Sequence, residues 1–144
     1  SDSAALHGLV GALCAVLPPP ALRVLRDPTR GGLGATLNEI ARASGVGMQL
    51  AETAIPVHEP VRAACEFLGL DPLYVANEGK LIAIVDPDHA EAALAALRAH
   101  PLGREAARIG VCTDDGQRFV ELETGFGGRR VIDWIAGEQL PRIC

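Results

Sequence analysis

Aromatic residues are scarce in this sequence. Tryptophan, tyrosine and phenylalanine together make up 3% of the 144 residues, whereas 49% of the residues are hydrophobic, mainly alanine, leucine and valine. This balance excludes an intrinsically disordered chain, because such chains contain too little apolar surface to fold. Small apolar side chains at this density are typical of alanine-rich helices that pack closely on a sheet. The length is that of one domain with its own core.

Basic residues and long apolar runs are also lacking. The chain has 13 lysines and arginines against 18 acidic residues, with a net charge of −5, and Lys80 is its single lysine. A basic surface stripe, the usual mark of a nucleic-acid-binding protein, is therefore not expected. No apolar run is long enough to span a membrane, and the first residues do not form a secretion signal. We predict a cytoplasmic protein that binds neither nucleic acid nor membrane.

The four cysteines do not form a metal-binding pattern. They include no C-x-x-C pair and no close cysteine–histidine cluster, so the sequence predicts no metal site. Reduced thiols are expected in a cytosolic chain of this size. Cys14, Cys65 and Cys112 have apolar neighbours and are predicted to be small buried hydrophobic residues. Cys144, which follows Pro141-Arg142-Ile143, has no such surroundings.

Helical and strand-like patterns are mixed along the chain. We expect helices in residues 1–17, 33–44, 60–70 and 87–100, and strands in 21–27, 46–55, 79–86, 106–114, 117–124 and 128–135. A turn and a short strand are expected in 71–77, and Asp114-Asp115-Gly116 is a hairpin-turn signal. The order favours an α+β fold, with helices packed on one face of a mostly antiparallel or mixed sheet.

The first candidate motif runs from Asp27 to Ala41, "DPTRGGLGATLNEIA", where a strand end leads into a glycine-rich turn and a helix. Paired glycines let the backbone approach an anion, and the first N–H groups of a helix point toward it. Asp27 and Thr29 are candidates to hold a metal-bound phosphate, and Arg30 to contact an anion. The alternative is a simple tight turn in which Asp27 or Thr29 caps the helix.

The second candidate motif, "DPLYVANEGKL", places Asn77, Glu78 and Lys80 just before an apolar strand. A carboxylate, an amide and an ammonium group at a strand entrance can form a catalytic site. The alternative is an exposed turn. Cys144 also has two readings, a mobile nucleophile or a frayed chain end, and its thiol is reactive only as the thiolate.

Taken together, "LRDPTRGGLGATLNEIA", "LDPLYVANEGKL" and the terminal "PRIC" resemble the C-terminal half of the HypE family of hydrogenase maturation proteins. That family belongs to the superfamily of aminoimidazole ribonucleotide synthetase and selenophosphate synthetase. The resemblance covers essentially the whole chain. It implies the C-terminal domain of that fold in residues 1–135, followed by a flexible tail in 136–144 that ends in the carrier cysteine.

The resemblance also implies a chemistry. A HypF-type carbamoyltransferase loads a carbamoyl group onto the Cys144 sulfur. Phosphorylation by ATP and loss of phosphate and protons then leave a thiocyanate. The cyano group is passed to iron on a HypC–HypD complex, for the nickel–iron hydrogenase site. By the matching motif, Glu78 would be the base and Asn77 would orient the carbamoyl group, whereas Lys80 is a weaker candidate.

Within the same resemblance, the residues bordering the nucleotide phosphates would be Asp27, Thr29, Arg30, Gly31 and Gly32. Members of the family form homodimers through an N-terminal domain that supplies most ligands of ATP and magnesium, and we expect that domain to be absent here. The chain alone would then carry the thiol without completing the reaction. Two other functions stay open: another ATP-dependent member of the superfamily, or a non-catalytic partner-binding domain.

Overall fold

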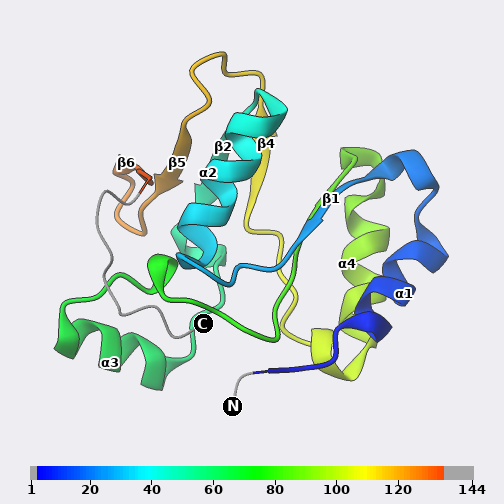
Figure 1. The fold of residues 1–144 in the computed structure, drawn as a ribbon, viewed down its shortest axis with the longest axis horizontal. Coiled ribbons are helices and arrows are strands. Elements are labelled where there is room, and N and C mark those ends of the chain that lie inside the picture. Colours follow the sequence, from blue (N-terminus) through cyan, green and yellow to red (C-terminus); the bar gives the residue numbers. More distant parts are fainter. Residues whose placement is uncertain (1–2, 135–144) are drawn as a thin grey trace. The chain divides into compact units, whose positions relative to one another are not determined.

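The computed structural model describes residues 3–134, which form two compact units. Of the described residues, the first unit contains 3–28 and 78–108, and the second contains 29–77 and 109–134. Each unit combines helices with strands, so the predicted α+β class is confirmed (Figure 1). The predicted tail, 136–144, lies outside the described residues. The boundary proposed at residue 135 therefore stays a prediction.

In the first unit, two helices pack on one face of a two-stranded antiparallel sheet (Figure 1). Leu9, Leu13 and Leu17 follow each other at four-residue intervals, so they lie on one face of the first helix and are buried. Pro18 follows and cannot continue the helix. The elements are α1 (His7–Val16), β1 (Leu22–Arg26), β3 (Ile82–Val85) and α4 (Ala90–Ala99), with 3₁₀ turns at Pro19–Ala21, Pro87–His89 and Pro101–Gly103.

The second unit has a four-stranded mixed sheet, in the order β4-β2-β5-β6. β2 is antiparallel to β4 and parallel to β5, and β6 is antiparallel to β5. Leu37, Ile40 and Ala41 form the buried face of α2, as their helical spacing predicts. The elements are α2 (Gly32–Ser44), β2 (Gly47–Ala51), α3 (Glu59–Leu68), β4 (Gly110–Thr113), β5 (Val120–Glu123) and β6 (Arg129–Val131), with 3₁₀ turns at Glu52–Ala54 and Pro72–Tyr74.

Two local predictions were wrong. The turn at Asp114-Asp115-Gly116 does not close a hairpin, because β4 and β5 pair with opposite edges of β2 rather than with each other. The short strand expected within 71–77 is absent from that segment, where Pro72–Tyr74 forms a 3₁₀ turn. Pro72 favours this outcome, since its fixed φ suits the first turn of a helix and it has no N–H to donate to a sheet.

The cysteine prediction holds only for Cys65, which is buried, whereas Cys14 and Cys112 are exposed. Cys14 follows Leu13 in α1, and one helical step rotates its side chain about 100° away from the buried face. Cys112 lies on β4, which is an edge strand of its sheet. Apolar neighbours in sequence therefore did not predict burial, because neighbouring residues of a helix or strand face different directions.

Candidate functional site

The first candidate motif forms the start of α2. Gly31, the N-cap residue, has φ of 72°, and Gly32 has φ of 63°. Both values lie in the left-handed region, which side chains other than glycine's disfavour. The Gly32 N–H donates to the Thr29 carbonyl at 3.3 Å, and the Ala35 N–H donates to the Gly31 carbonyl at 3.2 Å. The paired glycines therefore let the chain turn sharply into the helix.

The alternative in which Asp27 or Thr29 caps this helix is wrong, because no side chain among residues 3–134 caps α2. The first turn also contains no acidic residue, and Arg30, which directly precedes the N-cap residue Gly31, is exposed. The partial positive charge of a helix N-terminus favours an anion. The start of α2 thus suits a phosphate group better than it suits a cation.

The structure brings the first motif against the second. A Cβ atom added at Gly32 would lie 2.5 Å from the Val75 carbonyl oxygen and 2.7 Å from the Leu73 carbonyl oxygen. Only a residue without a side chain fits this approach. The Pro72–Tyr74 turn is itself fixed by Asp71, whose carboxylate accepts a hydrogen bond from the Leu73 N–H at 3.0 Å. The glycine turn and the segment leading to Asn77 therefore share one site within the second unit.

Asn77 is half-buried, and its Nδ2 donates to the Val75 carbonyl at 3.0 Å. Glu78 and Lys80 are exposed in a turn that includes Gly79, with φ of 62°. The exposed-turn interpretation of this segment is thus correct as a description of local structure, and an exposed turn can still carry a catalytic carboxylate. One N–H of the Asn77 amide is used in this turn, which leaves its Oδ1 and its second N–H for a ligand.

The predicted site residues do not all belong to one unit. Thr29, Arg30, Gly31, Gly32 and Asn77 lie in the second unit, where the structure brings the glycine turn and the Val75–Asn77 segment together. The other described candidates are exposed residues of the first unit: Asp27, Glu78 and the weaker candidate Lys80. Cys144 lies outside the described residues.

Sequence reasoning missed two polar residues beside this site, Asn38 and Tyr74. Asn38 is buried within the apolar face of α2, and its Nδ2 donates to the Ile132 carbonyl at 2.9 Å. The Tyr74 hydroxyl donates to the Asp133 carbonyl at 3.0 Å. An amide inside a helical apolar stripe was the available signal for Asn38, since buried polar groups require partners. For Tyr74 the available signal was its position within the second motif, "DPLYVANEGKL".

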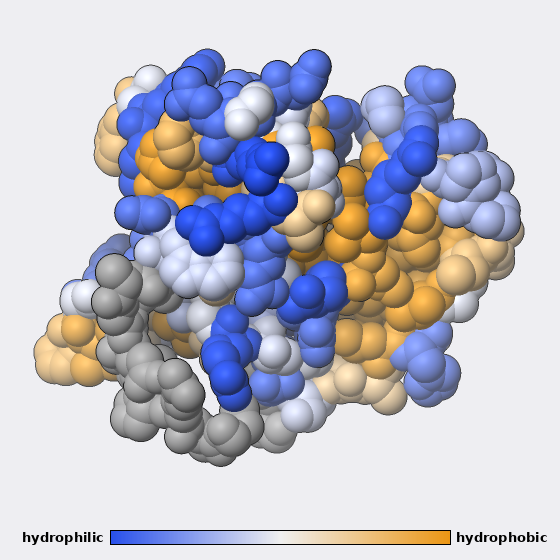
Figure 2. Space-filling view, turned by 45° about the horizontal axis from the view of Figure 1, so that its top comes forward, coloured by the Kyte–Doolittle hydropathy of each residue, from blue (hydrophilic) through white to orange (hydrophobic). Residues whose placement is uncertain are grey.

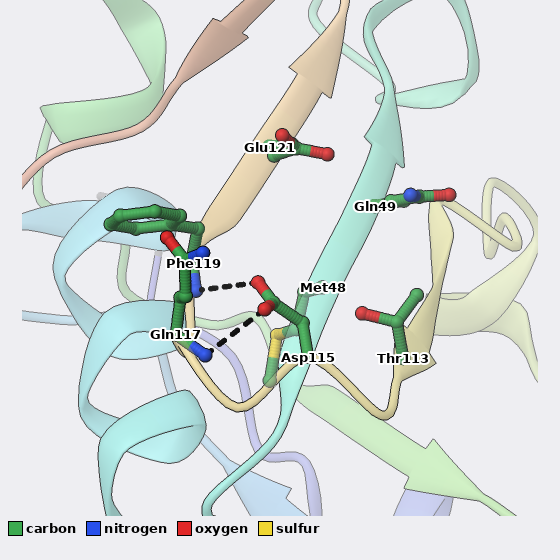
Figure 3. Close-up of a pocket in the computed structure, with 7 residues that line it drawn as sticks. All are labelled: Met48, Gln49, Thr113, Asp115, Gln117, Phe119 and Glu121. Carbon is green, nitrogen blue, oxygen red and sulfur yellow. Dashed lines mark hydrogen bonds between the residues drawn. The ribbon is translucent and has the colours of Figure 1, made fainter.

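One hollow of the second unit lies away from these residues. A pocket of about 440 Å³ opens on the four-stranded sheet, and none of the predicted site residues lines it (Figure 3). Gln49 and Glu121 are register partners on β2 and β5, and Asp115 accepts hydrogen bonds from the backbone N–H groups of Gln117 and Phe119. These bonds form a local turn, so this pocket gives no reason to move the candidate site away from the two motifs.

Within residues 3–134, no group of three or more histidine, cysteine or acidic side chains is arranged to hold a metal ion. Over the same residues, no helix has the length and apolar character that crossing a membrane requires.

Comparison with known proteins identifies the fold. The family model of the AIR synthase related protein, C-terminal domain, matches residues 2–123. The chain belongs to this family. Both candidate motifs lie inside the matched range, so the glycine turn and the Asn77 segment are features of an AIR synthase related C-terminal domain. The predicted superfamily and the fold expected from it are confirmed.

Within this family, the chain shows high sequence identity to HypE proteins. It is 71% identical over all 144 residues to the carbamoyl dehydratase HypE of Azotobacter vinelandii, of which it covers 42%. The chain therefore spans less than half the length of that relative. The solved structure of hydrogenase maturation protein HypE in complex with ATP matches all of this chain at 53% identity, with a TM-score of 0.89 and 44% of its own length covered.

A second solved structure is a HypE–HypF complex. It matches 92% of this chain at 44% identity with a TM-score of 0.87, over 42% of the matched chain. The resemblance to the HypE family predicted from the sequence is thus confirmed by relatives that match from end to end.

Proposed function

We propose that this chain is the carrier part of an ATP-dependent carbamoyl dehydratase that acts in the cytoplasm during nickel–iron hydrogenase maturation. The observation that carries the proposal is the 71% identity to a carbamoyl dehydratase HypE, which extends over all 144 residues and so includes Cys144. In this proposal Cys144 receives a carbamoyl group through its sulfur, and the group is dehydrated to a thiocyanate for transfer of cyanide to the hydrogenase iron.

The start of α2 would border the nucleotide phosphates. Its uncapped N–H groups, the close backbone approach at Gly32 and the exposed Arg30 suit a polyphosphate. Gly31 and Thr29 shape the turn through their carbonyls, and Asp27, two residues before Thr29 in the sequence, is the carboxylate of the motif. ATP, when bound, supplies the phosphoryl group that turns the carbamoyl oxygen into a leaving group. The ATP-bound HypE relative supports this assignment.

The remaining steps belong to three side chains. The Cys144 thiolate attacks the incoming carbamoyl carbon, because thiolates are strong nucleophiles and sulfur can later release the cyano group. Glu78 removes protons from the carbamoyl nitrogen, for which an exposed carboxylate on a turn is accessible. Asn77 orients the carbamoyl group through its side-chain amide, which the hydrogen bond from Nδ2 to the Val75 carbonyl holds in place.

The length of the relatives limits what this chain does alone. It covers 42% of the Azotobacter vinelandii HypE, and we infer that most ligands of ATP and magnesium, together with the homodimer contacts, belong to the remainder of such a protein. The chain by itself would accept the carbamoyl group without dehydrating it. A HypF-type carbamoyltransferase would load it, as the HypE–HypF structure of a relative suggests, and a HypC–HypD complex would accept the cyano group.

The test is intact mass after incubation with a HypF-type carbamoyltransferase, carbamoyl phosphate and ATP. We expect a carbamoyl adduct on this chain that does not lose water, and none on Cys144→Ser. Peptide mapping must locate the adduct, because Cys14 and Cys112 are also exposed. A full-length HypE relative is the positive control. Loading of that relative, but never of this chain at Cys144, would overturn the proposal.

A partner-binding domain is the second candidate function, and α3 favours it. Cys65 is the single buried residue of this helix, whereas Phe67 is 90% exposed and Leu68 is 64% exposed. Figure 2 shows hydrophobic surface at the lower left, where α3 lies. Apolar surface of this kind is common at protein contacts. Cys144→Ser separates the two functions, since a pure binding domain would keep its activity in maturation.

A further inference from the structure

The chain leaves β6 at Val131, and the next three residues are held by contacts with side chains and by one backbone hydrogen bond to β5. The Ile132 carbonyl accepts a hydrogen bond from Asn38 Nδ2 at 2.9 Å. The Ile132 side chain is fully buried, and its N–H donates to the Val120 carbonyl at 2.7 Å. Asn38 Nδ2 also donates to the Gly34 carbonyl at 2.9 Å. One amide of α2 thus joins that helix to the segment after β6.

The next carbonyl along the chain, that of Asp133, accepts a hydrogen bond from the Tyr74 hydroxyl at 3.0 Å. The Tyr74 ring reaches this position past Gly34. A Cβ atom added at Gly34 would lie 2.7 Å from the Tyr74 ring and 3.2 Å from Ile132 Cγ2. The missing side chain at Gly34 therefore makes room for both residues, and α2, the Pro72–Tyr74 turn and the segment after β6 meet at one point.

Two further contacts flank these hydrogen bonds. Arg130 Nη2 lies 2.7 Å from the Asp71 carboxylate, and the Arg42 guanidinium lies 4.9 Å from the centre of the Trp134 ring. The side chains in these contacts with residues 130–134 come from α2 or from the Asp71–Tyr74 turn, and backbone pairing with β5 continues as far as the Ile132 N–H. The helix and the turn are the two elements that position Gly31, Gly32 and Asn77. We call residues 130–134, with Asn38 and Tyr74, the anchor.

We propose that Asn38 and Tyr74 are positioning residues for the carrier cysteine. Their hydrogen bonds fix the backbone of Ile132 and Asp133 to the elements of the candidate site. The fixed end of the segment leading to Cys144 is then Trp134 and not the last residue of β6, and this sets the largest distance that the thiol can reach. This inference rests on the proposed carrier role of Cys144. Cys144 is the tenth residue after Trp134, and ten residue steps span at most about 35 Å.

Two neutral hydrogen bonds of this kind are also consistent with a purely structural role. Varying the length of the tail distinguishes that role from the positioning role. Removing residues one at a time from 136–140 shortens the reach of the thiol by at most about 3.5 Å each. At some length, a carbamoyltransferase no longer loads Cys144. If these hydrogen bonds fix the point from which the tail extends, the double variant Asn38→Ala/Tyr74→Phe frees residues 133 and 134, while Ile132 stays buried and bonded to Val120. The length limit should then move by about one to two residues.

The experiment measures carbamoyl loading by intact mass across the deletion series, with the anchor intact and in the double variant. We expect the double variant to accept deletions that abolish loading in the intact chain. Without deletions, loading should change by no more than about twofold, because effective concentration depends weakly on a few added linker residues. Thr124→Val, which removes hydrogen bonds of the β5–β6 turn outside the anchor, is the matched control and should leave the limit unchanged.

Coinciding length limits in the two series would overturn the anchor proposal while leaving the carrier role intact. A failure of loading at every length, with the full-length relative loaded, would overturn the carrier role instead. The anchor then has its own measurement, the fluorescence of Trp134, which is the single tryptophan. Tyr74→Phe should increase amide exchange at residues 133 and 134 by about five- to tenfold and shift Trp134 emission, and an unchanged signal would refute the anchor itself.

Discussion

Both units bury an apolar core, and the second unit adds hydrogen bonds from the side chains of one element to the backbone of another. Leu13, Leu17 and Ala93 form the core between the helices and sheet of the first unit, and the Arg23–Asp86 ion pair lies at its surface. In the second unit, Asn38 and Tyr74 bond to backbone carbonyls far along the chain. The difference shows where precise placement matters, because hydrogen bonds are directional and apolar contacts are not.

The largest expected effect on stability is in the first unit. Leu13→Ala removes a fully buried side chain and should lower the free energy of unfolding by about 2–5 kcal/mol. Chemical denaturation followed by circular dichroism measures this change. Val16→Ala is the control, since Val16 lies on the same helix and is 46% exposed. Equal losses for the two variants would mean that packing of α1 does not stabilise the first unit.

Gly32→Ala tests the close approach in the second unit. The positive φ should cost about 1–2 kcal/mol, and the clash with the Val75 and Leu73 carbonyls should add about 1–3 kcal/mol. Gly45→Ala separates the two effects, because Gly45 has φ of 71° but no atom within 4 Å of an added Cβ. The difference in free energy of unfolding between these variants isolates the contact between the motifs. A Gly32→Ala loss no larger than that of Gly45→Ala would contradict it.

Gly11→Ala should have the opposite sign. Gly11 lies inside α1, and a Cβ atom added there meets nothing within 4 Å. Alanine reduces the entropy of the unfolded chain and favours the helix, so the free energy of unfolding should rise by about 0.5–1 kcal/mol. Thermal denaturation of the variant beside the parent chain checks this. A lower midpoint would show that α1 has a contact at Gly11 that the structure does not contain.

The stability of the two units should also depend on pH at opposite ends of the pH scale. Burial, followed by the nearby Asp71 carboxylate, raises the pKa of Tyr74 in the second unit. A raised pKa gives stability that is fully present below the ordinary tyrosine value of about 10 and is lost as pH rises through the folded-state value. Raising the pH through the alkaline range should therefore lower the free energy of unfolding of the parent chain more than that of Tyr74→Phe. Equal alkaline losses would contradict this assignment.

At acid pH the corresponding group is Asp86 of the first unit. A hydrogen bond from the Asp88 N–H, followed by one from Arg23, lowers its pKa. A lowered pKa gives stability that is present above the ordinary aspartate value and is lost as pH falls through the folded-state value. Because Asp86 is at the surface, we expect this to be the smallest effect. Asp86→Asn should reduce the loss of unfolding free energy at acid pH and leave the alkaline range unchanged. A change in the alkaline range would show that the lowered pKa of Asp86 is not the cause.

Local patterns predicted much of the candidate site. The glycine turn of Gly31 and Gly32 was identified because paired glycines before an apolar helical period mark a sharp entry into a helix. Its contact with Val75 was not, since a contact across more than forty residues leaves no periodic signal. The same reason explains the false hairpin at Asp114-Asp115-Gly116. A turn signal specifies a local change of direction and does not specify which strand lies beside which.

The sequence by itself determined the helices, most strands and the family, because apolar spacing, proline and glycine act over a few residues and the two motifs are written in consecutive letters. The tertiary structure alone decided that β2 lies between β4 and β5, that Cys14 and Cys112 face outward, and that Asn38 and Tyr74 hold the chain after β6. These features depend on contacts between residues distant in sequence, which form only when the whole unit packs.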